Sequence, residues 1–159
     1  MKAYIVGPLF TEAEERQRLL EGQSLRTLFE KLGIELELSN PVEFNFDGDT
    51  SSSDIFRMDY ERLKAADFII FDLSNEDSGS CVALGMTINQ LMNGRDVKIY
   101  PVIHDCRLSR NSKSGLESTC GFNSMVVGCL KANNINIYNG FKEVLKAILK
   151  DMKEGKYNV

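Results

Sequence analysis

The sequence predicts an α/β fold: one doubly wound, five-stranded parallel sheet, flavodoxin-like or Rossmann-like, with helices on both faces. Short β-rich runs alternate along the 159 residues with longer segments of helical spacing, and this alternation is typical of successive β-α units. The run Phe68-Ile69-Ile70-Phe71 is apolar on both faces, as buried parallel strands are. We expect residues 1–159 to form a single domain, because a chain of this length buries a core of its own.

The first half of the chain is expected to supply three strands and two helices. Residues 3–6 form a short apolar strand that Gly7-Pro8 ends. Residues 12–32 have apolar side chains at helical spacing, and Gly33 is the expected stop signal of this helix. Residues 35–38 alternate apolar and acidic side chains, as an edge strand does. A second helix is predicted over 54–66 and the central strand over 68–72.

The second half is expected to complete the sheet. A third helix is predicted over 80–92 and a fourth strand over 97–102, followed by a short helix over 123–130. Residues 135–138 are the last predicted strand, and the apolar positions of residues 141–152 fall on one helical face. The polar stretches 43–53 and 104–121 are expected to be loops, and the first lacks the ligand spacing of a calcium-binding loop.

Composition excludes several classes of function. The net charge of −4 and the isoelectric point near 5.1 disfavour a nucleic-acid-binding surface, which needs clustered Lys and Arg. No apolar run approaches the roughly 20 residues that span a bilayer, so no membrane association is expected. The N-terminal residues do not have the pattern of a signal peptide. We therefore expect a cytoplasmic protein.

The cysteines and the histidine predict neither a metal site nor a cofactor. Cys81, Cys106, Cys120 and Cys129 have no CxxC spacing, and His104 is the only histidine, so a zinc site is not expected. The four cysteines are expected to be free thiols in a reducing compartment. Phosphate-binding patterns of the GxxxxGK[ST] and GxGxxG kinds are also absent. A neutral ligand therefore fits the sequence better than a nucleotide.

Four polar segments should meet at the carboxyl edge of the sheet, where open α/β folds bind ligands. They are the loop Gly7-Pro8-Leu9-Phe10, the helix position Asp59, the turn Asp77–Ser80 and the segment at Asn123. Each also has a purely structural interpretation. Asp59 fits a solvated helix face, and Asp77 and Asn123 fit helix N-caps. Tyr4 fits the packing of the first strand.

The order of these motifs resembles the nucleoside 2-deoxyribosyltransferase family over nearly the whole chain. The resemblance rests on Tyr4-Ile5-Val6-Gly7-Pro8-Leu9-Phe10, on Asp59, on Phe122-Asn123-Ser124-Met125 and above all on one signature. The family pattern Asp-x-Gly-[ST]-x-x-Glu-x-Gly here becomes Asp77-Ser78-Gly79-Ser80-Cys81-Val82-Ala83-Leu84-Gly85. The family transfers the deoxyribosyl group of a 2′-deoxynucleoside to another nucleobase. The resemblance implies retaining chemistry, with a covalent sugar–carboxylate intermediate.

The resemblance also implies roles for individual residues. The family's nucleophilic Glu falls on Ala83, and Tyr4 matches the tyrosine that orients this Glu. Asp77 and Asp59 match two further aspartates of the catalytic site. Substrate binding would involve Gly7, Pro8, Phe10, Gly79, Ser80, Asn123, Met125 and Tyr157. Asn123 matches a residue lent by a neighbouring subunit, and Tyr157 is the candidate for a C-terminal aromatic that completes a neighbour's site.

Ala83 is the departure from the family pattern. A methyl group cannot attack the sugar, and loss of a covalent nucleophile usually costs several orders of magnitude in rate. The chain is therefore expected to bind a deoxynucleoside and a free nucleobase but to be inactive or nearly so. Three interpretations stay open: a transferase from which the Glu was deliberately removed, a natural nucleoside-binding protein, and an N-glycosidase of the same superfamily. The resemblance implies a homo-oligomer, a dimer that builds a tetramer or hexamer, with sites shared between subunits.

Overall fold

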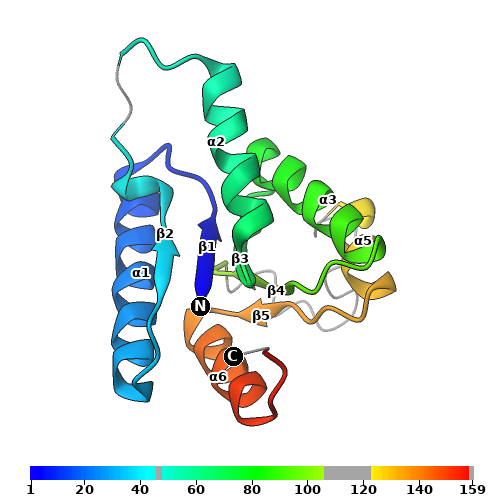
Figure 1. Ribbon diagram of the computed structural model, residues 1–159. Helices are drawn as coiled ribbons and strands as arrows, with labels where there is room; N and C mark the ends of the chain where they lie inside the picture. Colours follow the sequence, from blue (N-terminus) through cyan, green and yellow to red (C-terminus); the bar gives the residue numbers. More distant parts are fainter. Residues whose placement is uncertain (46–47, 106–122, 158–159) are drawn as a thin grey trace.

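Five parallel strands form one sheet in the order β2-β1-β3-β4-β5, shown in the computed structural model of Figure 1. The structure describes residues 1–45, 48–105 and 123–157. The strands are β1 (Lys2–Val6), β2 (Glu37–Ser39), β3 (Phe68–Asp72), β4 (Lys98–Ile103) and β5 (Tyr138–Asn139). All four neighbouring pairs are parallel, so the predicted flavodoxin-like sheet is confirmed.

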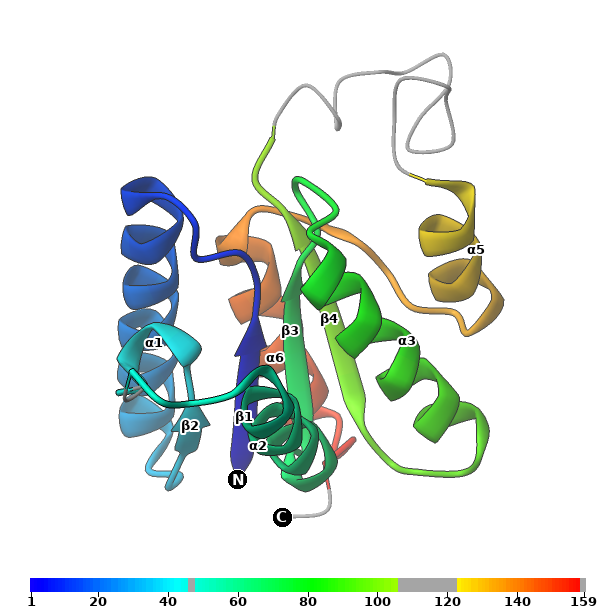
Figure 2. The same ribbon diagram turned by 90° about the horizontal axis from the view of Figure 1, so that it is seen from above.

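Helices cover both faces of the sheet (Figures 1 and 2). One face packs on α1 (Glu12–Leu32) and α6 (Phe141–Lys153). The other packs on α2 (Ser52–Ala65), α3 (Ser78–Met92) and α5 (Ser124–Ala132). A short 3₁₀ helix, η1 (Pro41–Glu43), follows β2. Alternate residues of β1 point to opposite faces, so Tyr4 belongs to the core under α2 and α3 while Ile5 belongs to the core under α1 and α6.

The predicted boundaries agree best where the sequence signals are strongest. The helix over 12–32 and the strand over 68–72 have the expected bounds, and Gly33 ends α1 with φ 68°. The two edge strands start later than expected, at Glu37 and Tyr138, because an edge strand pairs on one side only. The predicted loop 104–121 lies almost wholly outside the described residues.

The sheet changes its winding direction between β1 and β3. From β1 the chain reaches β2 through α1 on one face, and from β2 it reaches β3 through α2 on the other face. A crevice forms at the carboxyl ends of two strands that are wound in opposite directions, and this is where open α/β sheets bind ligands. Gly7 follows β1 and Asp72 ends β3 at this point. Within the described residues, no helix is both long and apolar enough to cross a membrane.

Candidate functional site

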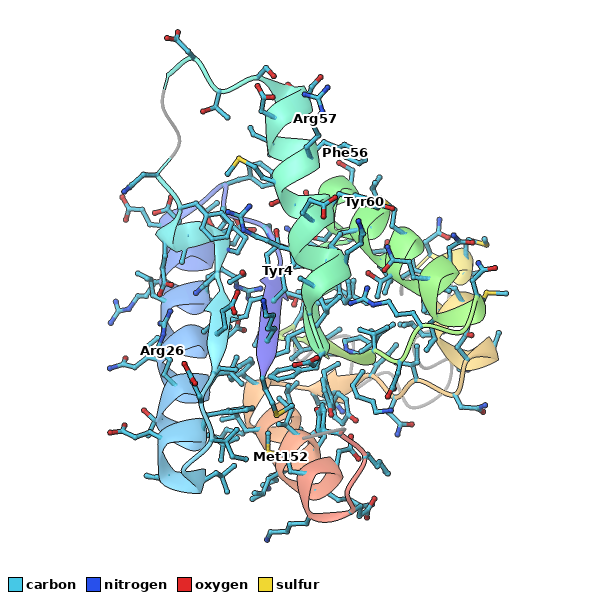
Figure 3. The ribbon with its side chains drawn as sticks, in the orientation of Figure 1. Tyr4, Arg26, Phe56, Arg57, Tyr60 and Met152 are labelled. Carbon is cyan, nitrogen blue, oxygen red and sulfur yellow. The ribbon has the colours of Figure 1, made fainter. Side chains whose placement is uncertain are left out.

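Tyr4 and Asp59 meet on the face of the sheet that α2 covers. The Tyr4 hydroxyl donates a hydrogen bond to Asp59 Oδ1 at 2.7 Å, although the two residues are 55 positions apart in the sequence. Figure 3 shows Tyr4 on β1 beside α2. Tyr4 is buried, whereas the Asp59 side chain is 37% exposed. Burial raises the pKa of Tyr4, and the neighbouring Asp59 charge raises it further, so this hydroxyl remains a donor at neutral pH.

A cation lies beside the same carboxylate. Arg62 Nη1 is 3.9 Å from Asp59 Oδ1, one helical turn further along α2. The guanidinium carbon of Arg62 lies 3.9 Å from the ring centroid of Phe44, a cation–π distance that fixes the long side chain in place. Asp59 is therefore oriented by a neutral donor and faced by a positive charge, which is more than a solvated helix-face carboxylate requires.

Asp77 is the N-cap of α3, as its structural interpretation predicted. Its Oδ2 accepts hydrogen bonds from the Ser80 backbone N at 2.7 Å and from Ser80 Oγ at 2.8 Å. The cap starts α3 at Ser78, two residues earlier than the sequence pattern indicated. Ser80 is buried and Gly79 is exposed. The signature motif thus forms a tight strand-to-helix turn, in which Asp77 caps the N-terminus of α3.

Ala83 lies in the core between α3 and the sheet. It is 9% exposed and belongs to the same apolar cluster as Tyr4 and Val6. Residues two positions away on α3 lie on another side of the helix: Cys81 and Gly85 line a different cavity, between α3 and α5. A longer side chain at position 83 would therefore extend among residues of the Tyr4 cluster.

Asn123 joins the turn that carries Asp77. Its backbone N donates to Glu76 Oε1 at 2.6 Å, and its side chain caps α5 by accepting from the Met125 backbone N at 2.9 Å. Glu76 has φ 50°, a left-handed conformation that is uncommon outside glycine. Both segments border a cavity of 630 Å³ between α3 and α5, which Cys81, Cys129 and Met125 also line.

The thiols at this cavity are poorly suited to nucleophilic chemistry. Burial raises the pKa of Cys81, and the charges of Glu76 and Asp77 raise it further. Burial likewise raises the pKa of Cys129. Both residues are free cysteines, as expected, and a raised pKa lowers the thiolate fraction at neutral pH. Cys106 and Cys120 lie outside the described residues.

The remaining predicted binding residues lie at two opposite ends of the sheet. Gly7 and Pro8 follow β1 at the crevice, and Phe10 is 79% exposed at the end of the same loop. Tyr157 lies apart from them: it borders the same small cavity as Met1, Asp67 and Lys98, at the amino ends of the strands. It is buried, and its hydroxyl is hydrogen-bonded to that of Tyr100. The structure does not bring Tyr157 to the other candidates.

The sequence patterns gave no sign of a buried charge network on the opposite face. Arg18, on α1, is 1% exposed and contacts Asp72 Oδ2 at 2.5 Å and, through Nε, Glu21 Oε2 at 3.1 Å. His104 Nε2 lies 2.9 Å from Glu21 Oε1. Helical periodicity places positions 18 and 21 beside Leu25 on one face of α1. That spacing was the available signal, since a charged residue on an apolar face needs a partner.

The Arg18 network also holds the turn that leads to Asp77. Asp72 Oδ1 accepts from the Ser74 backbone N at 2.9 Å and from Ser74 Oγ at 2.5 Å. Ser74 Oγ in turn accepts from the His104 backbone N at 2.8 Å. Among the residues that the structure describes, no group of three or more His, Cys, Asp or Glu side chains is arranged to hold a metal ion.

Known proteins resemble this chain in sequence and in fold. No family model matches the chain. The chain is 26% identical, over 161 residues, to the uncharacterized protein UU063 of Ureaplasma parvum serovar 3, and the match covers 97% of this chain and 98% of that protein.

Solved structures share the fold over almost the whole chain. A conserved protein from Enterococcus faecalis V583 superposes with a TM-score of 0.69 at 20% identity, covering 94% of this chain and 98% of that one. The 2-desoxiribosyltransferase from Leishmania mexicana gives 0.58 at 18% identity, with 94% and 97% covered. The CMP N-glycosidase BcmB of Clostridium botulinum gives 0.56 at 16% identity, with 93% and 98% covered. The fold is thus one that enzymes of nucleoside glycosyl transfer and hydrolysis also use.

Proposed function

We propose that this chain binds a 2′-deoxynucleoside at the carboxyl edge of the sheet and is built on a deoxyribosyltransferase scaffold. The observation that carries the proposal is the hydrogen bond of 2.7 Å between Tyr4 and Asp59. The family resemblance assigns both residues to one site, although they lie on different elements. Their contact is what a shared site requires, and the fold shared with the Leishmania mexicana enzyme supports the same proposal.

Retaining transfer needs a carboxylate at the anomeric carbon and an acid near the leaving base. Asp77, at the turn before α3, is the proposed acid or base-holding group. The proposed position of the nucleophile, residue 83, carries only a methyl group and faces the cluster that contains Tyr4. We therefore propose that nucleoside binding persists while transfer is slower by several orders of magnitude than with a carboxylate at this position.

The decisive experiment restores the carboxylate by Ala83→Glu. The variant is incubated with a 2′-deoxynucleoside and a different free base, over a panel of purines and pyrimidines, and the exchanged nucleoside is quantified by chromatography. We expect a rise in exchange of at least about a thousandfold over the unmodified chain. Ala83→Gln is the matched control: it has nearly the same volume without the nucleophilic oxygen, and it should leave the rate unchanged.

The same assay separates the alternatives. A transferase needs the acceptor base, whereas an N-glycosidase releases free deoxyribose, or its 5′-phosphate from a nucleotide, without one. A folded Ala83→Glu protein that binds nucleosides by calorimetry, yet neither exchanges nor hydrolyses any of them, would contradict the enzymatic proposal and leave a nucleoside-binding protein.

We further propose that a second copy of the chain covers the cavity between α3 and α5. Two apolar side chains that line it are largely exposed, Met125 at 80% and Met92 at 72%. Lending of Asn123 to a neighbouring subunit, as the resemblance implies, would place a partner here. Light scattering after size-exclusion chromatography tests this: Met125→Glu should lower the observed mass to that of a smaller species, whereas Lys150→Glu, on α6, should not.

A further inference from the structure

Asp59 has the surroundings of a reactive carboxylate and not only those of a binding group. One oxygen, Oδ1, accepts the hydrogen bond of the buried Tyr4 hydroxyl at 2.7 Å. The same oxygen is 3.9 Å from Arg62 Nη1. A hydrogen bond from a fixed donor orients the carboxylate, and a positive charge lies beside the same oxygen. The nucleophile of a retaining glycosyl transfer must be charged and oriented in this way.

The second oxygen of Asp59 is free to react. Within the described residues, Asp59 Oδ2 accepts no hydrogen bond from the protein, and the side chain is 37% exposed. Tyr4 and Arg62 cannot easily move away. Tyr4 is 2% exposed, and Arg62 is fixed on the Phe44 ring. The arrangement therefore presents one oxygen to a ligand while it holds the other.

The other carboxylates near this edge have different partners, and no ion pair to a cation is found for Asp77 or Glu76 among the described residues. Asp77 Oδ2 accepts two hydrogen bonds from Ser80. Glu76 Oε1 accepts the Asn123 backbone N. Asp72 faces α1, on the opposite side of the sheet, where it is 5% exposed. Among these described acids, Asp59 has a positioned donor and an adjacent cation on one oxygen and leaves the other oxygen without a hydrogen bond. Asp54, on the same helix, uses both oxygens, on Ser51 and on Arg57.

We infer that Asp59 is the nucleophile that remains in this chain, so that slow glycosyl transfer proceeds through it. This inference rests on the proposed function. Asp59 Oδ2 would form a bond to C1′ of the deoxyribose as the bond from C1′ to the base nitrogen breaks. The bonding electron pair leaves with the base, which takes a proton supplied by water. An acceptor base then attacks C1′, loses its proton to water and releases the Asp59 carboxylate.

The physical reason for a slow reaction is geometric. The proposed site was built for a Glu on α3, whereas Asp59 has one methylene less and projects from α2. A misplacement of about 1 Å from the attack position commonly costs about a hundredfold in rate. The native chain should therefore turn over measurably, but far below Ala83→Glu.

Four proteins test the inference: the native chain, Asp59→Asn, Ala83→Glu and the double variant. Each is incubated with a 2′-deoxynucleoside, first alone and then with an acceptor base. Acid-quenched samples are analysed by intact mass and by peptide mapping for an added deoxyribosyl group. We expect the native adduct on the peptide that contains Asp59, and a loss of native turnover of at least about tenfold in Asp59→Asn. The double variant should form its adduct on the introduced Glu.

Glu61→Gln is the matched control, because it changes an exposed acid on the same helix whose partner is Lys64. Its turnover and adduct should equal those of the native chain. Mapping the adduct on the native chain needs no variant and so does not depend on how Asp59→Asn folds. An adduct elsewhere, or native turnover that Asp59→Asn leaves unchanged, overturns the inference. So does a native chain without turnover when Ala83→Glu exchanges bases, whereas inactivity of both overturns the proposed function itself.

Discussion

Two groups of charged side chains lie on opposite faces of the same central strands, and they are built in different ways. Under α1, the Arg18 network brings Arg18, Glu21 and Asp72 together with side-chain exposures of 1%, 1% and 7%. Under α2, the Tyr4–Asp59 pair leaves its carboxylate 37% exposed. In the Arg18 network the charged groups pair with one another. In the Tyr4–Asp59 pair, Asp59 Oδ2 has no hydrogen-bond partner among the described residues.

The two groups have different roles: the Arg18 network stabilises the carboxyl edge of the sheet, whereas the Tyr4–Asp59 pair is proposed to contact a ligand there. A closed network of buried charges has no free oxygen for a ligand, and its members are costly to remove singly. An open carboxylate contributes little to stability but can bind or react. Through Asp72 and Ser74, the closed network holds the turn before Asp77. The closed network therefore stabilises this edge from one face of the sheet, and the chemistry that we propose lies on the other face.

The largest effect on stability is expected from Arg18→Met. The substitution replaces the guanidinium with a shorter apolar side chain and leaves Asp72 and Glu21 buried without the Arg18 charge, which should lower the free energy of unfolding by about 3–5 kcal/mol. Denaturant unfolding measures this. The matched control is Arg26→Met, because Arg26 and Glu43 are ion-paired at 47% and 34% exposure and should lose at most about 1 kcal/mol. Equal losses would contradict the distinction between the two faces.

Gly7→Ala should give the next largest effect. A Cβ at Gly7 would lie 2.1 Å from Arg18 Nη1 and 3.0 Å from Asp72 Cβ, and Arg18 cannot retreat without leaving its two carboxylates. We expect a loss of about 1–3 kcal/mol, as for overpacking in a core. Gly85→Ala is the control, since nothing lies within 4 Å of its added Cβ; on helix propensity alone it should stabilise slightly. Combining Gly7→Ala with Arg18→Met should cost less than the sum of the two.

Tyr4→Phe should have a smaller effect on stability and a clearer one on function. The substitution removes the donor to Asp59, at a cost of about 1 kcal/mol because the acceptor remains partly hydrated. Measured by thermal unfolding, this loss should be well below that of Arg18→Met. In the Ala83→Glu background the same change should lower kcat for base exchange more than it raises KM. A loss as large as that of Arg18→Met would mean that the open pair is also a main support of the fold.

The smallest expected effect is the pH dependence of that Tyr4 contribution. Burial, followed by the Asp59 charge, raises the pKa of Tyr4 in the folded chain, while the unfolded tyrosine titrates near pH 10. The stabilising contribution is complete at pH 8, falls as the pH approaches 10 and is lost further above it, because only the unfolded chain releases the proton. Between pH 8 and pH 10 the native chain should lose about 0.4 kcal/mol more than Tyr4→Phe. A parallel pH dependence of the two proteins would contradict the raised pKa.

The sequence predicted most of the fold because its signals are local. The helix bounded by Gly33, the apolar strand 68–72 and the alternation of element types depend on periodicity and on single stop residues. The short edge strands were placed less well, since few neighbours fix where an edge strand begins. For the candidate site, the order of motifs along the chain led to Tyr4, Asp59 and Asp77 as predictions; Tyr4 and Asp59 are in contact, and Asp77 and Asn123 are helix caps.

The Arg18 network and the position of Tyr157 could not be predicted from local pattern. Arg18 is polar, and by composition alone it would be assigned to the surface, but it lies under Gly7 with 1% exposure. Tyr157 follows a charged C-terminal helix, yet its ring packs 5.9 Å from that of Phe68. Helical spacing can place Arg18 on the buried face of α1, but the partners of Arg18 and of Tyr157 depend on contacts between elements that are distant in sequence.

By itself, then, the sequence determined the order of strands and helices, the ends of its longest helix and the presence of a methyl group where the resembled family has a carboxylate. Only the tertiary structure decided which acids meet which partners. Asp72 and Asp59 look alike in sequence, but alternation along β3 turns Asp72 toward the buried Arg18, while α2 places Asp59 against the Tyr4 hydroxyl. The chemistry available to a carboxylate is set by burial and by its nearest charges, and both are properties of packing across the sheet.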